Sequence, residues 1–198
     1  MIFPEEKIRS HAKKLLSGSE RGAHSFSHVE RVYDIAKNLG ERMGANMRIL
    51  GAAALLHDIG RPKEEETGKS HAILSGEMSK EFLHNIGYDE EEIVSVVEAI
   101  RSHRFSENIE PTSLEGEILS DADKLDAMGA IGIFRAIARA TLRNLGIPGF
   151  LKHAEEKLLK LVDCMYTEEG EKIAHERHEL LQAFVEKLKA EVRNDLAH

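Results

Sequence analysis

Apolar positions recur with helical spacing along almost the whole chain. Apolar residues stand three, four and seven positions apart in successive segments, a spacing typical of amphipathic helices with one buried face. The sequence has no alternating β-branched runs between tight turns, which would indicate strands. The pattern therefore predicts an all-α protein. Its expected helices cover residues 5–17, 26–43, 46–59, 70–86, 89–103, 113–127, 129–145, 148–165 and 169–194.

Breaks between these segments agree with the spacing. Asp89, followed three residues later by Glu92, is typical of a capped helix start. The glycines and proline of residues 146–149 indicate the sharpest break in the second half of the chain. Residues 60–69 are highly charged and predict an exposed, mobile loop, which is either a plain connection or a lid over a neighbouring site.

The chain length of 198 residues fits a single domain over residues 1–198. We expect its core at about residues 20–140, with the C-terminal helices at about 148–194 packed on that core. Apolar stripes on these last helices either cover the chain's own core or form a homodimer contact, and the sequence leaves both open.

The overall charge narrows the expected partners. A net charge of -8 argues against a nucleic-acid duplex or an anionic membrane surface as the main partner. No apolar run reaches the roughly 18–20 residues that a membrane span needs. The single cysteine, Cys164, rules out an internal disulfide, and residues 1–7 lack a signal-peptide pattern, so we expect a cytoplasmic protein.

Several ionisable residues fall on apolar helix faces, where their side chains should turn inward. They are His28, His57, His71, His103 and Asp123, with Asp58 next to His57 at the end of an apolar run. One such histidine alone is best explained as a hydrogen-bonded core residue. The whole set would need many separate partners, whereas a single metal centre accounts for all of it.

The mixed imidazole and carboxylate donors suit a divalent ion of iron, manganese, zinc, cobalt or nickel better than magnesium or calcium. The remaining histidines lack a clear apolar context, and we expect them to be solvated. They are His11, His24, His84, His153, His175, His178 and His198.

Three separate segments carry the inward residues in order along the chain. These segments are residues 27–32, 54–60 and 121–126. They resemble the motifs of the HD superfamily of metal-dependent phosphohydrolases, and the resemblance extends over about residues 20–140. It implies an HD-domain helical bundle with extra C-terminal helices, and a metal ion held by the ligands His28, His57, Asp58 and Asp123.

His71 and His103 resemble the additional ligands of the two-metal branch of this superfamily, in which Asp58 would bridge the two ions. The HD-GYP cyclic-dinucleotide phosphodiesterases use this arrangement. Here, however, Arg104 stands in place of their next histidine, and no Gly-Tyr-Pro segment occurs. Residues 126–132 are more similar to those of small stand-alone prokaryotic HD proteins described as predicted hydrolases.

The resemblance implies hydrolysis of a small phosphate ester, such as a nucleotide, by water whose pKa the metal lowers to about 7 in favourable cases. Asp58 and Lys124 are the candidate catalytic residues. The candidate substrate-binding residues are the nearby cations Arg31, Lys63, Arg104 and Arg135. Two alternatives remain open: a di-iron oxygenase of the same superfamily, and a regulatory module that binds metal without turnover.

Overall fold

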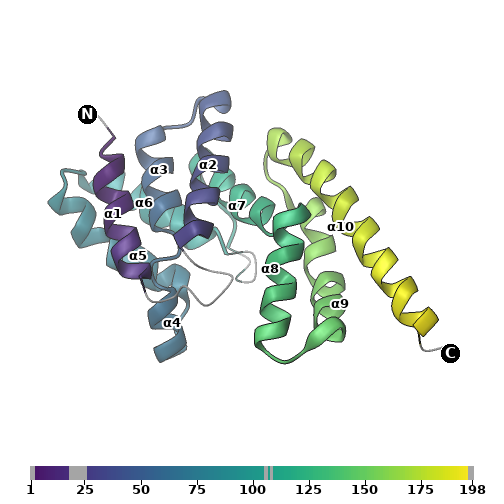
Figure 1. The fold of residues 1–198 in the computed structure, drawn as a ribbon. Helices are drawn as coiled ribbons and strands as arrows, with labels where there is room; N and C mark the ends of the chain where they lie inside the picture. Colours follow the sequence, from purple (N-terminus) through teal and green to yellow (C-terminus); the bar gives the residue numbers. More distant parts are fainter. Residues whose placement is uncertain (1–2, 18–25, 105–106, 108, 196–198) are drawn as a thin grey trace. The chain divides into compact units, whose positions relative to one another are not determined.

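The computed structural model describes residues 3–17, 26–104, 107 and 109–195, and these residues form an all-α structure without strands (Figure 1). This confirms the predicted fold class. The helices are α1 (Glu5–Leu16), α2 (Phe26–Met43), α3 (Met47–Leu56), α4 (Arg61–Thr67), α5 (His71–Asn85), α6 (Glu90–Ser102), α7 (Leu114–Asp126), α8 (Gly129–Leu142), α9 (Gly146–Glu156), a 3-10 helix (Leu158–Cys164) and α10 (Glu168–Asp195).

The chain divides into two compact units, Met1–Asp123 and Lys124–His198, with the boundary inside α7. The expectation that residues 1–198 form one domain, with the C-terminal helices packed on its core, stays a prediction. None of the described helices is both long enough and apolar enough to cross a membrane.

The first unit is built around α3. Every residue from Leu50 to Leu56 is buried, because α3 is apolar on all sides and packs against α1, α2, α5 and α6. Asn46 caps its start by accepting a hydrogen bond from the backbone N–H of Arg48 at 3.1 Å. The predicted capping box of Asp89 and Glu92 is present at the start of α6. Because α3 is buried up to its last residue, the residues that directly follow it, 57–60, also lie in the core of the unit.

Two predictions about helices were wrong. Residues 61–67 form α4 instead of a loop, with Pro62 in its first turn, Glu64 in the same turn, and Gly68 closing it at φ +72°. This helix buries none of its seven residues, so it has no apolar stripe by which sequence spacing could reveal it. Residues 148–165 do not form one helix, since α9 ends at Glu156 and a 3-10 helix begins at Leu158.

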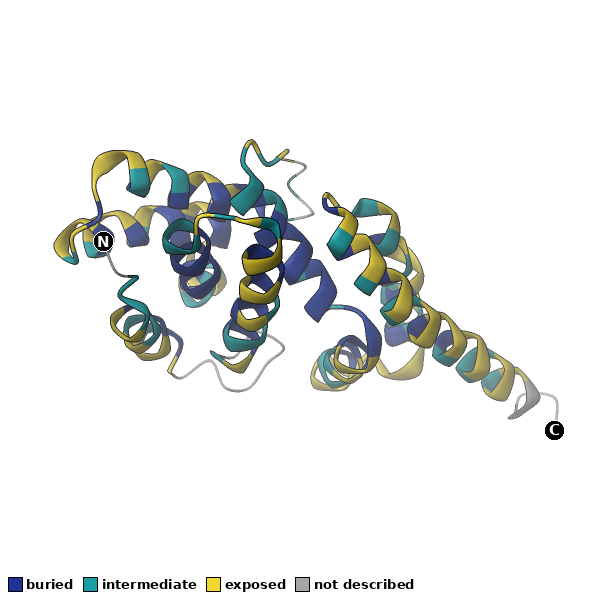
Figure 2. Cartoon of the chain, turned by 90° about the horizontal axis from the view of Figure 1, so that it is seen from above, coloured by how far each residue is buried: buried dark blue, intermediate teal, exposed yellow. Residues whose placement is uncertain are grey.

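The second unit has its own core. Here α8 packs against α9 and α10, and the 3-10 helix packs against α9 and α10. The apolar side chains that this arrangement buries include Phe150, Leu158, Leu161, Leu181 and Val185. Residues 186–193 of α10 are all at least partly exposed (Figure 2). The C-terminal stripes thus cover a core within this unit.

Candidate metal centre

Five elements of the first unit each contribute a residue at or near a helix end. His28 lies in the first turn of α2, His57 and Asp58 follow α3, and His71 is the first residue of α5. His103 directly follows α6, and Asp123 lies in α7. The four histidines and Asp58 are almost completely buried, whereas the side chain of Asp123 is 27% exposed.

Gly60 allows the end of α3 to approach the start of α5. A Cβ atom at this position would stand 2.7 Å from the carbonyl oxygen of His71 and 2.8 Å from the backbone nitrogen of Ser75. The backbone N–H of Gly60 also donates a hydrogen bond of 2.9 Å to Ser75 Oγ. Only glycine fits this close contact, which brings Asp58 and His71 together.

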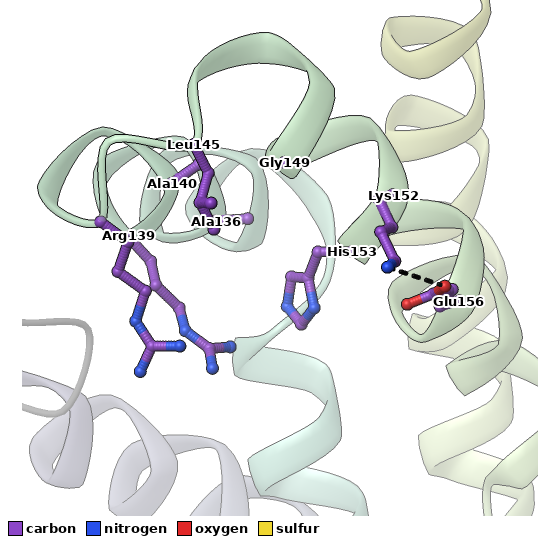
Figure 3. Close-up of a pocket in the computed structure, with 9 residues that line it drawn as sticks. Ala136, Arg139, Ala140, Leu145, Gly149, Lys152, His153 and Glu156 are labelled. Atoms are coloured by element: carbon purple, nitrogen blue, oxygen red, sulfur yellow. Dashed lines mark ion pairs between the residues drawn. The ribbon is translucent and has the colours of Figure 1, made fainter.

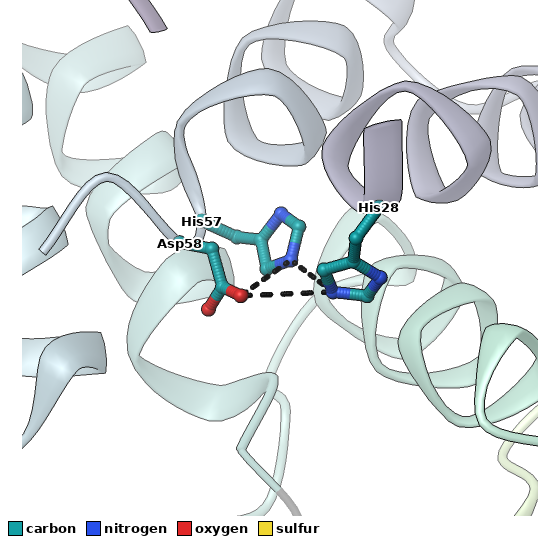
Figure 4. Close-up of side chains that lie close together, drawn as sticks. All are labelled: His28, His57 and Asp58. Carbon is teal, nitrogen blue, oxygen red and sulfur yellow. Dashed lines mark hydrogen bonds and ion pairs between the residues drawn. The ribbon is translucent and has the colours of Figure 1, made fainter. Parts of the chain in front are cut away.

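The first group of possible ligand atoms belongs to His28, His57 and Asp58 (Figure 4). The Nε2 atoms of the two histidines are 3.4 Å apart. Asp58 Oδ2 lies 3.6 Å from Nε2 of His28 and 3.9 Å from Nε2 of His57. Asp123 Oδ1 approaches the same His28 nitrogen at 3.2 Å, so four of the sequence-predicted residues meet here.

The second group belongs to Asp58, His71 and His103. The Nε2 atoms of the two histidines are 3.3 Å apart. Asp58 Oδ1 lies 3.3 Å from Nε2 of His71 and 3.9 Å from Nε2 of His103. The two carboxylate oxygens of Asp58 therefore face two different histidine pairs.

The other ring nitrogen of three histidines faces an acceptor. Nδ1 of His57 lies 2.8 Å from the carbonyl oxygen of Ala54, and Nδ1 of His103 contacts the carbonyl oxygen of Ile100. Nδ1 of His71 lies 3.0 Å from a carboxylate oxygen of Glu64. Because these oxygens only accept, we infer that each Nδ1 carries the proton.

Burial keeps these rings neutral near pH 7. It lowers the pKa of His57 to about 4 and also lowers the pKa values of His71 and His103. With the proton on Nδ1, the Nε2 atoms of His71 and His103 direct lone pairs towards each other across 3.3 Å. Two facing lone pairs repel, so this geometry favours a cation between them.

The distances also agree with a shared ion. Two nitrogens bound at about 2.0–2.1 Å to one metal lie roughly 2.8–3.4 Å apart. The shorter separations correspond to octahedral bond angles and the longer ones to tetrahedral bond angles. Both histidine pairs fall in this range, at 3.4 and 3.3 Å. Imidazole donors with a carboxylate suit a divalent transition metal rather than calcium. The residues present therefore fit one or two such ions.

Asp123 supplies negative charge at the more open side of the centre. Burial raises the pKa of its carboxyl group, but the hydrogen bond from His28 and the positive charge that the histidines carry at low pH outweigh this, and the pKa lies well below its usual range. The carboxylate is therefore ionised at neutral pH and can act as a ligand or as a hydrogen-bond acceptor.

The structure distributes the sequence-predicted cations over both units. In the first unit, Arg31 is half-buried on α2 and Lys63 is exposed on α4. Arg104 forms ion pairs with Glu64 at 2.8 Å and with Glu107 at 3.0 Å. In the second unit, Arg135 forms an ion pair with Asp126.

Lys124, at the start of the second unit, is buried. Its ammonium group donates to the carbonyl oxygen of Cys164 at 2.7 Å. The same nitrogen lies 4.1 Å from the centre of the Tyr166 ring. Both of these contacts are with residues of the second unit.

Two charged residues that the sequence did not reveal also lie at the centre. Nε of Arg61 donates to Asp58 Oδ1 at 2.9 Å, and Arg61 Nη1 lies 3.3 Å from Glu64 Oε2. Both residues belong to α4. The sequence could have indicated Arg61 and Glu64 only if a helix had been predicted at residues 61–67. Residues three apart on a helix lie on the same face, so both would then have been placed on one side of α4.

The histidines expected to be solvated differ among themselves. His84 and His175 are exposed, as expected. His11 is only partly exposed and stacks on Phe82 with ring centres 3.8 Å apart, and His153 and His178 are also partly buried. Of the described histidines, these three are exceptions to the expectation, while His24 and His198 lie outside the described residues.

Comparisons with known proteins identify related chains and a family. The family model of the HD domain matches residues 25–128. An uncharacterised protein of Bacillus subtilis, YpgQ, is 34% identical over 195 residues, which cover 94% of this chain and 93% of YpgQ. The crystal structure of YpgQ in complex with ADP superposes with a TM-score of 0.77 at 30% identity, covering 95% of this chain and 97% of that one.

Two further solved structures carry a functional description. A predicted HD superfamily hydrolase from an uncultured Thermotogales bacterium has a TM-score of 0.72 at 32% identity, covering 94% of this chain and 91% of its own. An HD-superfamily hydrolase from Bacillus thuringiensis has a TM-score of 0.75 at 31% identity, covering 96% of each chain.

Proposed function

The chain belongs to the HD-domain family, and we propose that it is a metal-dependent phosphohydrolase that acts on a small phosphate ester of nucleotide type. The similar proteins described as HD superfamily hydrolases support the reaction class. The ADP complex of YpgQ supports a nucleotide-like substrate.

One observation carries the proposal: the two oxygens of Asp58 face two histidine pairs. We assign His28, His57, Asp58 and Asp123 to one ion and Asp58, His71 and His103 to a second. A divalent ion bound there supplies an acidified water molecule and orients a phosphoryl oxygen. The carboxylate of Asp58 would contribute a ligand atom to each of the two ion positions.

The chain's own residues determine how a substrate approaches. The four histidines and Asp58 are closed to solvent, while the carboxylate of Asp123 is 27% exposed, so the phosphoryl group enters from the side of Asp123. The oxygen of Asp123 that is not bound to the ion would accept a hydrogen bond from the attacking water. The low pKa of the carboxyl group keeps this oxygen in the accepting form.

Arg61 and Arg104 are the cations of the first unit that lie around Glu64. The side chain of Arg61 is 21% exposed and that of Arg104 is 30% exposed, so neither side chain is closed to solvent. Guanidinium groups bind phosphoryl oxygens with two parallel hydrogen bonds and stabilise the charge that develops on them. We assign both to the phosphoryl group. Arg31, Lys63, Lys124 and Arg135 stay candidates from the sequence alone.

The test combines metal analysis with two activity assays. Protein purified without added metal is analysed for bound ions, then assayed for nitrophenol release from phosphate mono- and diesters and for oxygen uptake with candidate diols. We expect bound transition metal and ester turnover. His57→Ala should lower turnover by more than the roughly 10–100-fold that loss of an outer-shell partner costs. The exposed His84→Ala is the matched control.

The other outcomes separate the alternatives. Copurified iron with oxygen uptake and no ester turnover identifies a di-iron oxygenase. Bound metal without turnover in either assay indicates a regulatory module. Protein that neither retains nor takes up metal contradicts the metal centre itself.

A further inference from the structure

A pocket lies in the C-terminal unit, between α8 and α9 (Figure 3). Its volume is about 330 Å³, at the lower end of the range of small-molecule sites. Its residues belong to Lys124–His198, and none of the six proposed metal ligands lines it. The pocket is therefore a feature separate from the metal centre.

Small residues on the two facing helices create the hollow. Ala136 and Ala140 are one helical turn apart on α8, and Gly149 lies opposite them on α9. A Cβ atom at position 149 would stand 2.3 Å from Cβ of Leu145, so this position is restricted to glycine. The pocket thus has apolar walls formed by short side chains.

Basic side chains from both helices surround these walls. Arg139 and Arg143 are four residues apart at the end of α8, and Lys152 and His153 come from α9. Figure 3 shows Arg139 and His153 extending to the same side of the hollow. The one carboxylate among the lining residues, Glu156, lies 3.9 Å from the ammonium nitrogen of Lys152.

The cations are close enough to influence one another. Burial lowers the pKa of His153, and the charges of Arg139, Lys157 and Arg143 lower it further. The helix dipoles explain one basic residue in the last turn of each helix, Arg139 on α8 and His153 on α9. They do not account for the hollow between the two helices. In a chain of net charge -8, this local excess of positive charge is typical of an anion site.

We propose that this pocket binds a small phosphorylated molecule, with the phosphate held by Arg139 and Arg143 and the remainder against Ala136, Ala140 and Leu145. Two guanidinium groups one helical turn apart can each donate two hydrogen bonds to phosphate oxygens. A ring N–H of His153 supplies a further donor. The proposal does not depend on the function of the metal centre.

Isothermal titration calorimetry with inorganic pyrophosphate tests the site on the full chain. The protein is first stripped of metal with a chelator, and His57→Ala is titrated in parallel, so that a bound metal ion cannot contribute. We expect binding in both. Each guanidinium group contributes hydrogen bonds to a charged partner, so Arg139→Ala with Arg143→Ala should weaken binding by at least 100-fold.

The control removes the same charge elsewhere. Lys187→Ala with Arg193→Ala takes two exposed cations from α10 and should change the dissociation constant less than about threefold. Equal weakening by both double variants would mean that overall charge attracts pyrophosphate, and would overturn the proposal. So would the absence of binding to the wild-type protein.

A second measurement locates the ligand and guards against misfolded variants. The ring resonances of His153 in an NMR spectrum should move as pyrophosphate is added, while those of the exposed His175 should not. Arg139→Lys with Arg143→Lys keeps the charge but loses the planar donor pairs, so it should bind at an intermediate strength. Calorimetric binding without any shift of His153 would contradict the site.

Discussion

Arg61 and Asp58 form a hydrogen-bonded ion pair at the centre of the first unit, with Arg61 Nε 2.9 Å from Asp58 Oδ1. The same oxygen lies 3.3 Å from His71 Nε2, while Oδ2 faces His28 and His57. Arg61 is therefore one of several contacts that orient the carboxylate, whose two oxygens face the two histidine pairs.

Asp58→Asn should remove metal from both positions at once, because an amide keeps the shape of the side chain but loses the charge and one acceptor oxygen. Elemental analysis should show the metal content of the purified protein falling by most of its wild-type value. Asp163→Asn, an exposed substitution of the same kind, should leave it unchanged. Loss of only one of two ions would show that Asp58 does not bridge.

Glu64→Ala should weaken one metal position selectively. Glu64 accepts from Nδ1 of His71 at 3.0 Å and from its backbone N–H at 3.2 Å, so it orients the ring. Removal of such an outer-shell partner typically costs about 10–100-fold in metal affinity. Metal titration of the stripped protein should resolve this loss.

The neighbouring residue on α4 provides the control for Glu64. Glu65→Ala removes an exposed carboxylate from the same helix and should leave both affinities unchanged. Glu64→Gln retains an acceptor oxygen and should have a smaller effect than Glu64→Ala. An equal loss in Glu65→Ala would assign the effect to the charge of α4 instead of to the contact with His71.

Arg61→Ala should raise KM for a phosphate ester by about 10–100-fold, because the variant loses hydrogen bonds to a charged phosphoryl group. Metal content should be retained, because Asp58 keeps its negative charge when Arg61 is removed. Steady-state kinetics on the metal-loaded enzyme measures the effect. Lys63→Ala compares the residue proposed from the sequence with the one indicated by the structure. A rise in KM in Lys63→Ala but not in Arg61→Ala would favour Lys63 as the substrate-binding residue.

The metal-free protein should lose stability as the pH falls from about 6.5 towards 4. Burial lowers the pKa of His57 to about 4 from the 6.5 of an exposed ring, and the pKa values of His71 and His103 are also lowered. In this range the unfolded chain binds protons that the folded chain does not. The free energy of unfolding therefore decreases, by up to about 3 kcal/mol for His57 alone.

Urea unfolding at a series of pH values measures this dependence. In His57→Gln the decrease between pH 6.5 and 4 should be smaller, because one titrating group is removed. In His175→Gln, which changes an exposed ring, the dependence should match the wild type. An unfolding free energy that rises as the pH falls through this range would contradict the inferred neutral rings.

The sequence by itself determined the all-α class, most helix positions and which ionisable residues turn inward. These features are local: helical spacing decides which side chains share a face, and an apolar stripe decides which face is buried. His28, His57, His71 and His103 could be selected in this way because each lies on such a stripe.

Only the tertiary structure decided which side-chain atoms of different helices are in contact. The helix α4 has no buried face, so its two site residues, Arg61 and Glu64, left no periodic signal. The division of Asp58's oxygens depends on the close contact at Gly60 and on helices far apart in sequence. The basic pocket depends on the pairing of α8 with α9. Spacing along the chain fixes the direction of a side chain on its own helix, whereas the packing between helices fixes which atoms it meets.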